Sequence, residues 1–370
     1  MIYLDNASTT KPCAEAVTAV TQALTDNFGK PSSPHGIGIE AEKAISAARK
    51  RISSALFCEP ECVFFTSGAT ESNNFAIAGT AESYGKRKKR VVISNAEHPS
   101  AASPGEKLEK LGFEVVRASP QSILNAVDEN TCFVSCMLVN NETGAIFPVE
   151  KLFSAIKRRF PDIITHCDAV QAFLKIPFRA KTLNADIISL SGHKVYAPKG
   201  VGAVYVKKGV RPAPLIIGGG QEKNVRSGTE SVPLICAFGA AVEKFMGTTS
   251  QRLEYITGLK KHLLERLSEL ENITVLSPDN ASPYIVSIAV AGIKSETMLH
   301  FLEAKGIYVS SGSACSKGKK SGVLKALGAD ERLLDFIIRI SFSHENTALD
   351  IDRLVMAIMQ GQRELLKIKF

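Results

Sequence analysis

The segment ADIISLSGHKVYAPKG, residues 185–200, places Lys194 a few positions after the apolar run Ile187–Leu190. A short apolar run that ends in small residues is typical of a strand buried in a sheet. A lysine held at the end of such a strand is partly desolvated, so its amine can lose a proton and form a Schiff base with an aldehyde. A surface lysine in a glycine-rich loop is the alternative interpretation. The segment alone favours that alternative, and the rest of the chain reverses the preference.

The chain around this segment has the pattern of a mostly parallel sheet covered by helices. Between about residues 60 and 210, short β-branched runs alternate with amphipathic stretches such as 72–84 and 149–159. The expected strands are 62–66, 90–94, 132–139, 163–167, 187–190 and 202–206. Polar residues follow most of these strands. Because ligand sites of open α/β sheets lie beyond the carboxyl ends of the strands, we expect a site at that edge.

A change of character after about residue 245 predicts a second domain. A long helical pattern over 253–270 is followed by short expected strands at 285–290, 307–309 and 337–341. We expect a large domain over 15–248. A smaller α+β domain is expected from 1–14 together with 249–370.

Composition indicates an ordinary globular protein. The chain has 370 residues, of which 45% are hydrophobic and 22% charged, and its net charge is +8. No apolar stretch reaches the length of a membrane span and the first residues lack a signal pattern, so we expect a cytoplasmic protein. The basic run 86–90 is interpreted as a solvated loop, because no aromatic residues interleave with it to stack on bases. No direct nucleic-acid or membrane partner is expected.

The eight cysteines form no disulfide framework. Cys58 and Cys62 are four apart, as are Cys132 and Cys136, but neither pair has His or Cys partners at zinc-site spacing. We interpret these residues as buried core thiols and expect no metal.

Residues that follow the other expected strands match the needs of one coenzyme, pyridoxal phosphate. It requires an acid opposite its pyridine nitrogen, a group stacked on its ring, and donors for its phosphate. Asp168 is a candidate for the acid, with Gln171 close enough to reach the phenolic oxygen, although Asp168 could equally cap a helix. The turn 67–72 is rich in hydroxyl and small residues and precedes a helix, where phosphate binds well, although a helix cap looks similar.

A series of blocks along almost the whole chain resembles the cysteine desulfurases of the class V aminotransferase family, the NifS/IscS-like group. The blocks are 3–10, 65–74, 97–99, 140–144, 168–171, 191–194, 218–222, 226–230 and 310–315. The resemblance implies the fold type I of pyridoxal-phosphate-dependent transferases. This fold has a mostly parallel seven-stranded sheet with helices on both faces and a smaller α+β domain.

The resemblance also implies a role for each matching residue. Lys194 would carry the cofactor, His98 would stack on its ring and move protons, Asp168 would pair with the ring nitrogen, and Gln171 would bind the phenolic oxygen. The phosphate would be held by Ala69, Thr70, Ser191 and His193. Thr229 would reach the phosphate of the partner subunit, which implies a homodimer. Asn141 and Arg339 would hold the substrate carboxylate, a role that suits the guanidinium fork of arginine.

Cys315 separates this group from plain aminotransferases. It lies in an uncharged approach, 310–314, and is followed by Lys317, Lys319 and Lys320 in a Gly/Ser-rich loop. Nearby lysines favour the nucleophilic thiolate. The implied reaction converts L-cysteine to L-alanine, with Lys194 taking the Cα proton and the Cys315 thiolate taking the sulfur as a persulfide.

Departures from the family pattern leave the sulfur acceptor open. The loop after Cys315 is short and lysine-rich, and residues 342–345 depart from the family pattern at the start of the block 341–347. An iron–sulfur scaffold, a tRNA-thiolation enzyme or a partner with an acidic surface all remain. The alternatives to a desulfurase are a selenocysteine lyase, a cysteine sulfinate desulfinase, another class V aminotransferase, or a non-catalytic sulfur-carrier or regulatory protein. A nucleotide-binding dehydrogenase is disfavoured because no Gly-x-Gly-x-x-Gly opens a strand–helix unit.

Overall fold

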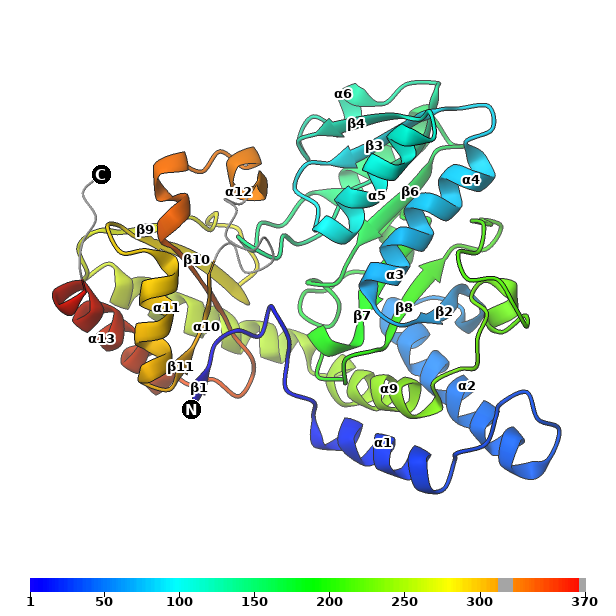
Figure 1. Ribbon diagram of the computed structural model, residues 1–370, viewed down its shortest axis with the longest axis horizontal. Helices are drawn as coiled ribbons and strands as arrows, with labels where there is room; N and C mark the ends of the chain where they lie inside the picture. The colour runs from blue at the N-terminus through cyan, green and yellow to red at the C-terminus, as the bar shows by residue number, and fades with distance from the viewer. Residues whose placement is uncertain (312–321, 366–370) are drawn as a thin grey trace. The chain divides into compact units, whose positions relative to one another are not determined.

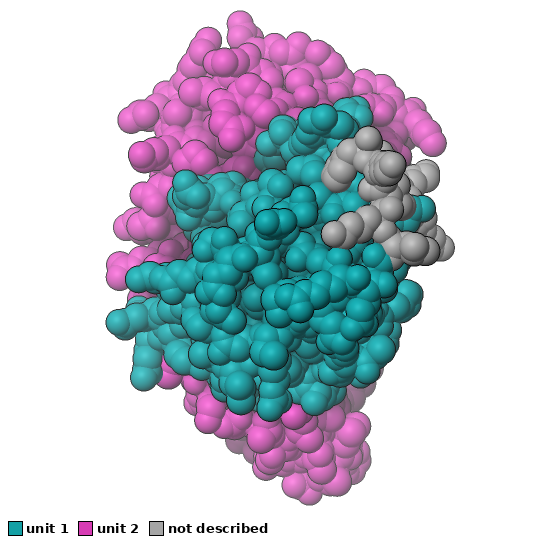
Figure 2. Space-filling view, turned by 90° about the vertical axis from the view of Figure 1, so that its left-hand side faces the viewer, with its two compact units in different colours: residues 1–10, 139–146, 250–370 teal, residues 11–138, 147–249 magenta. Residues whose placement is uncertain are grey.

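The computed structural model describes residues 1–311 and 322–365. The described chain forms two compact units, which Figure 2 colours separately. Unit 1 consists of Met1–Thr10, Val139–Ile146 and Ser250–Phe370. Unit 2 consists of Lys11–Leu138 and Phe147–Thr249.

Unit 2 contains a seven-stranded sheet (Figure 1). Its strands, in spatial order, are β2 (Val63–Thr66), β8 (Gly202–Val206), β7 (Ile187–Ser191), β6 (Ile164–Asp168), β5 (Thr131–Ser135), β3 (Arg90–Ser94) and β4 (Glu114–Ala118). Strand β8 runs antiparallel to both neighbours, whereas the pairs from β7 to β4 are parallel. Strand β2 therefore runs in the same direction as β7, and the carboxyl ends of all strands except β8 lie at one edge.

The helices of unit 2 pack in groups. Helices α1 (Ala14–Thr25) and α2 (Gly36–Leu56) both contact α9 (Val232–Met246). Helix α3 (Ala69–Asn74) continues through a π-helical turn, Phe75–Gly79, into α4 (Thr80–Tyr84), and α3 contacts α5 (Pro99–Lys110) (Figure 1). Unit 2 also contains helices α6 (Ile123–Ala126), α7 (Val149–Arg159) and α8 (Ala180–Leu183).

Several elements have the bounds expected from their sequence patterns, namely β3, β8 and α7. Helix α7 buries Val149, Phe153 and Ile156, whose spacings of four and three produce the amphipathic pattern. Strand β4 was not expected. It is an edge strand whose residues Glu114 and Arg117 are exposed, so it lacks the continuous apolar run of a buried parallel strand.

Unit 1 is built on a four-stranded antiparallel sheet. Its strands, in spatial order, are β12 (Ser310–Ser311), β13 (Ile337–Ser341), β10 (Ile285–Val290) and β9 (Ile273–Val275). Strand β1 (Ile2–Tyr3) pairs in parallel with β11 (Ile307–Tyr308). The helices are α10 (Thr249–Leu267), α11 (Ser295–Ala304), α12 (Gly322–Ala326) and α13 (Ala348–Glu364). One buried apolar cluster includes Leu4, Leu263, Ile338 and Ile358, so both ends of the chain contribute to this core.

The segment 139–146 is held within unit 1, although the sequence pattern placed it in the large domain. The Ser282 N–H donates to the carbonyl of Gly144 at 2.8 Å, and Ser287 Oγ donates to the carbonyl of Glu142 at 2.5 Å. The strand expected over 132–139 is correspondingly shorter in the structure, where β5 ends at Ser135. The domain boundaries 15–248 and 1–14 with 249–370 stay a prediction.

No helix in the ranges 1–311 and 322–365 is both long and apolar enough to cross a membrane. Those ranges also hold no group of three or more His, Cys, Asp or Glu side chains that could bind a metal ion. Burial raises the pKa of the Cys58 thiol to about 12 and that of Cys132 to about 11. These thiols are therefore poor nucleophiles at neutral pH.

Candidate active site

Lys194 lies in a tight turn directly after β7. The turn Gly192–Lys194 is closed by the Val195 N–H, which donates to the carbonyl of Gly192 at 2.9 Å, and Lys194 is half-buried. Gly192 is required here, because a Cβ on this residue would lie 2.9 Å from Val201 Cγ1. The local sequence therefore holds the amine at the carboxyl edge of the sheet.

Asp168 is the last residue of the neighbouring strand β6 and is only 4% exposed. Its Oδ1 accepts from the Val170 N–H at 3.0 Å, and its Oδ2 accepts from Asn73 Nδ2 at 2.8 Å. Both carboxylate oxygens are thus hydrogen-bonded and the carboxylate has one fixed orientation.

Gln171 is buried one turn after Asp168. Lys175 Nζ donates to Gln171 Oε1 at 2.8 Å, and both side chains are buried. With its oxygen directed at Lys175, the Gln171 amide directs its nitrogen the other way, as a hydrogen-bond donor. The phenolic oxygen of pyridoxal phosphate would accept a hydrogen bond from such a donor.

His98 follows β3 and caps the start of α5. The backbone N–H of Ser100 donates to His98 Nδ1 at 3.1 Å. Burial lowers the pKa of His98 and the neighbouring Lys194 lowers it further, while the Asp168 carboxylate acts in the opposite direction. The ring is therefore neutral at neutral pH, with its proton on Nε2.

Asn73 connects Asp168 to His98 through hydrogen bonds, and no role was predicted for it from the sequence. It is fully buried on α3, and its Nδ2 donates to Asp168 Oδ2 and, at 2.9 Å, to Ser100 Oγ. Ser100 Oγ in turn lies 2.8 Å from His98 Nδ1. The available signal was its position one turn into the helix that follows the expected phosphate-binding turn.

The residues expected at the phosphate all belong to unit 2. Ala69 and Thr70 begin α3 directly after β2, Ser191 ends β7, and His193 lies in the turn beside Lys194. Burial, together with Lys194, Lys199 and Lys175, lowers the pKa of His193 to about 4. Thr229 is exposed in the loop that precedes α9.

A buried chain of polar groups crosses the sheet beside Asp168. Glu97 Oε1 accepts from Ser135 Oγ at 3.3 Å, and His166 bonds to Ser135 Oγ and Ser189 Oγ, both at 2.9 Å. Burial and the charge of Asp168 raise the pKa of Glu97 well above its usual range. The neutral Glu97 carboxyl consequently adds no second negative charge beside Asp168.

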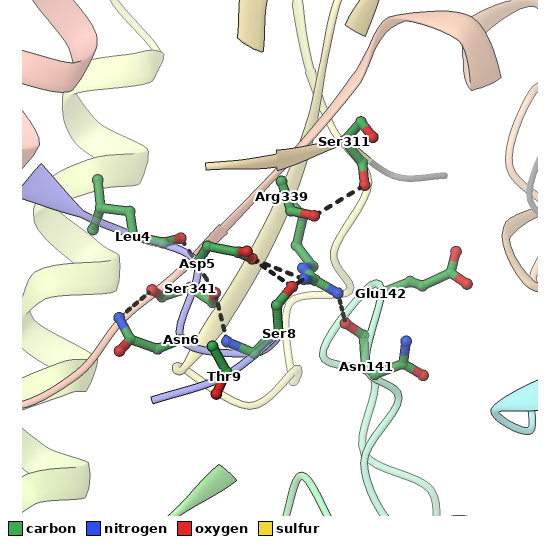
Figure 3. Close-up of polar contacts among 12 residues, drawn as sticks. Leu4, Asp5, Asn6, Ser8, Thr9, Asn141, Glu142, Ser311, Arg339 and Ser341 are labelled. Carbon is green, nitrogen blue, oxygen red and sulfur yellow. Dashed lines mark hydrogen bonds and ion pairs between the residues drawn. The ribbon is translucent and has the colours of Figure 1, made fainter. Parts of the chain in front are cut away.

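The two residues expected at a substrate carboxylate belong to unit 1 and are in contact there (Figure 3). Arg339 occupies the middle of β13, is 5% exposed, and is paired in register with Ser287 and Ser310. Its Nη1 donates to the backbone carbonyl of Asn141 at 2.9 Å. Cys315 lies outside the described residues.

Comparisons with known proteins place this arrangement in a family. The model of class-V aminotransferases matches residues 2–354. The chain belongs to the class-V aminotransferase family. The resemblance seen in the sequence blocks is thereby confirmed.

Individual relatives are similar over nearly the full length. The cysteine desulfurase IscS of Methanosarcina thermophila is 37% identical over 98% of this chain and 92% of its own. A solved structure titled NifS-like protein has a TM-score of 0.93 and 34% identity, and the match covers 98% of this chain and all (100%) of that one. The structure titled SspA in complex with cysteine has a TM-score of 0.81 and 32% identity, with 92% and 99% covered. These matches confirm the expected fold type I.

Proposed function

We propose that this protein is a pyridoxal-phosphate-dependent cysteine desulfurase, which converts L-cysteine to L-alanine and takes the sulfur onto Cys315 as a persulfide. The observation that carries the proposal is the set of Lys194, Asp168, Gln171 and His98 at one edge of the sheet in unit 2. Relatives named cysteine desulfurase, and a structural neighbour whose title names cysteine as its ligand, support the choice of substrate.

The donor set fits the coenzyme. Lys194 offers an amine for its aldehyde, Asp168 a carboxylate with one fixed orientation for its ring nitrogen, and Gln171 an amide donor for its phenolic oxygen. Ala69, Thr70, Ser191 and His193 would hold the phosphate. Bound pyridoxal phosphate supplies an aldehyde that takes up the amine of the substrate and a ring that withdraws electrons from Cα.

The chain's own residues then handle protons and sulfur. Lys194 Nζ takes the Cα proton of the substrate. His98, which is neutral at rest, would first take up a proton released from the substrate and then return it to a reacting group, so the ring moves protons between steps. Arg339 and Asn141 hold the substrate carboxylate. The Cys315 thiolate attacks the substrate sulfur, so that an S–S bond forms, the Cβ–S bond breaks, and the carbon skeleton leaves as alanine after protonation.

We further propose a cytoplasmic homodimer in which Thr229 contributes to the phosphate site of the partner subunit. Its exposure in the loop before α9 supports this role. The persulfide would pass to a sulfur-acceptor protein, either an iron–sulfur scaffold or a tRNA-thiolation enzyme.

The test uses the purified full chain. We expect a yellow protein that, with L-cysteine and a reductant, releases sulfide and alanine in equal amounts. Cys315→Ala should keep the colour and lose sulfide release, whereas Lys194→Ala should lose the Schiff-base absorbance and all turnover. A wild-type protein that stays colourless and inert after addition of pyridoxal phosphate would refute the proposal. Release of selenium from selenocysteine without turnover of cysteine would favour a lyase.

A further inference from the structure

The guanidinium of Arg339 already binds a carboxylate of its own unit (Figure 3). Arg339 Nη2 donates to Asp5 Oδ1 at 2.9 Å and to Ser8 Oγ at 2.5 Å. The two acceptors also bond to each other, since Ser8 Oγ donates to Asp5 Oδ1 at 2.8 Å. A residue proposed to bind the substrate carboxylate is thus paired with an internal one.

The ion pair with Asp5 uses Arg339 Nη2, the nitrogen that any bidentate contact with a second carboxylate would also use. A guanidinium binds a carboxylate in bidentate fashion through two parallel N–H groups, either Nε with Nη2 or Nη1 with Nη2. Both forks include Nη2, which donates to Asp5 and Ser8. Arg339 Nε is buried and has no acceptor among the described residues. The fork that remains to be completed is therefore Nε with Nη2, and a ligand carboxylate completes it only by competing with the hydrogen-bonded pair of Asp5 and Ser8.

Asp5 is held in position by the core of unit 1. Leu4 is fully buried next to it, and Asp5 forms a parallel bridge with Ser341, the last residue of β13. The Tyr3 hydroxyl donates to the carbonyl of Thr9 at 2.8 Å and closes the turn that carries Asp5 and Ser8. The Asp5 carboxylate is therefore a permanent neighbour of Arg339 and not a surface group that meets it by chance.

We propose that Asp5 is an internal competitor for the carboxylate site of Arg339. It keeps the buried guanidinium paired and oriented when no substrate is bound, and it yields Nη2 when the substrate carboxylate arrives. Asp5 thereby sets the affinity for carboxylate-bearing substrates. This inference rests on the proposed function, in which Arg339 binds the carboxylate of L-cysteine.

The test compares the wild-type holoenzyme with Asp5→Asn. The probe is 3-mercaptopropionate, which has the thiol and the carboxylate but no amine to react with the cofactor, and its Kd is measured by calorimetry. A neutral carboxamide is a weaker partner for the guanidinium than a carboxylate, so the Kd should fall about fivefold. The KM for L-cysteine should fall by a similar factor while kcat changes by less than about twofold. Binding of 3-mercaptopropan-1-ol, which lacks the carboxylate, should not change.

Asp352→Asn is the matched control, because Asp352 accepts from Arg266 Nε at 3.2 Å elsewhere in unit 1. It should leave both binding constants at the wild-type value. An Asp5→Asn protein that binds 3-mercaptopropionate as the wild type does, or more weakly, would overturn the inference.

Ser8→Ala covers the case in which Asp5→Asn does not fold. It removes the other acceptor of Arg339 Nη2 without changing charge, so the Kd should fall by about twofold. An unchanged or higher Kd in this variant would likewise count against competition at Nη2. Failure of the proposed function would look different, because the wild-type protein itself would then release no alanine from L-cysteine.

Discussion

Removing the Asn73 side chain tests the hydrogen-bond chain that joins Asp168 to His98. Asn73→Ala deletes the bond from Nδ2 to Asp168 Oδ2 and the bond from Nδ2 to Ser100 Oγ. A hydrogen bond to a charged group contributes about 1.5–3 kcal/mol and a neutral one about 1 kcal/mol. Asn73 Oδ1 is buried without a partner among the described residues, and its removal returns about 1–3 kcal/mol. With the central value of each contribution, the expected net loss in the free energy of unfolding is about 1 kcal/mol.

Urea-induced unfolding of the protein with and without pyridoxal phosphate measures this loss. Asn74→Ala is the control, because Asn74 lies next along the helix and donates only to backbone carbonyls, those of Thr70 at 2.9 Å and Ser100 at 3.4 Å, without touching Asp168 or the Ser100 hydroxyl. It should change stability by less than about 0.5 kcal/mol. Asn73→Asp should be worse than Asn73→Ala by several kcal/mol, since it buries a second carboxylate against Asp168.

Three results would contradict this reasoning. Asn73→Ala could be as stable as the wild type, Asn74→Ala could lose as much, or Asn73→Asp could be tolerated. Each would mean that the contacts of Asn73 with Asp168 and Ser100 do not stabilise the fold as their geometry indicates.

Three further predictions concern buried groups of unit 2. Burial lowers the pKa of His166 to about 3, so between pH 6.5 and 3 the unfolded chain binds the proton more tightly and stability falls as the pH falls. From pH 7 to 4.5 the wild type should lose about 3 kcal/mol more than His166→Gln in urea unfolding, and equal losses would contradict this. Glu222 accepts from both Nη atoms of Arg49, at 2.7 and 2.8 Å, and from the Phe65 N–H. Glu222→Ala leaves Arg49 without its carboxylate and should lower the free energy of unfolding by about 3–5 kcal/mol. Glu59→Ala is the control, because the Glu59 side chain is exposed. Gly192→Ala should weaken binding of pyridoxal phosphate at least tenfold in an absorbance titration because its Cβ meets Val201, while Gly247→Ala, which meets no neighbour, should not.

Sequence patterns predicted the buried strands well and the exposed edge strand poorly. Strands β3, β8, β10 and β13 have the expected bounds. Each is a short run of mostly apolar residues, and the residues that flank the run mark its ends. Edge strand β4 carries no such run and was missed. The segment 139–146 was assigned by its place in the chain, whereas its contacts with Ser282 and Ser287 lie far from it in sequence.

The sequence alone determined the alternation of strands and helices, the place of Lys194 after a buried strand, and the membership of the family. These three features follow from local periodicity and from blocks of neighbouring residues, and both are present in the amino-acid sequence itself. Only the tertiary structure decided the partners of each polar side chain. Asn73 bonds to Asp168, 95 positions away, and Asp5 to Arg339, 334 positions away. Buried polar groups must find acceptors and donors wherever packing brings them, so such pairs depend on the assembled core and leave no periodic trace in the chain.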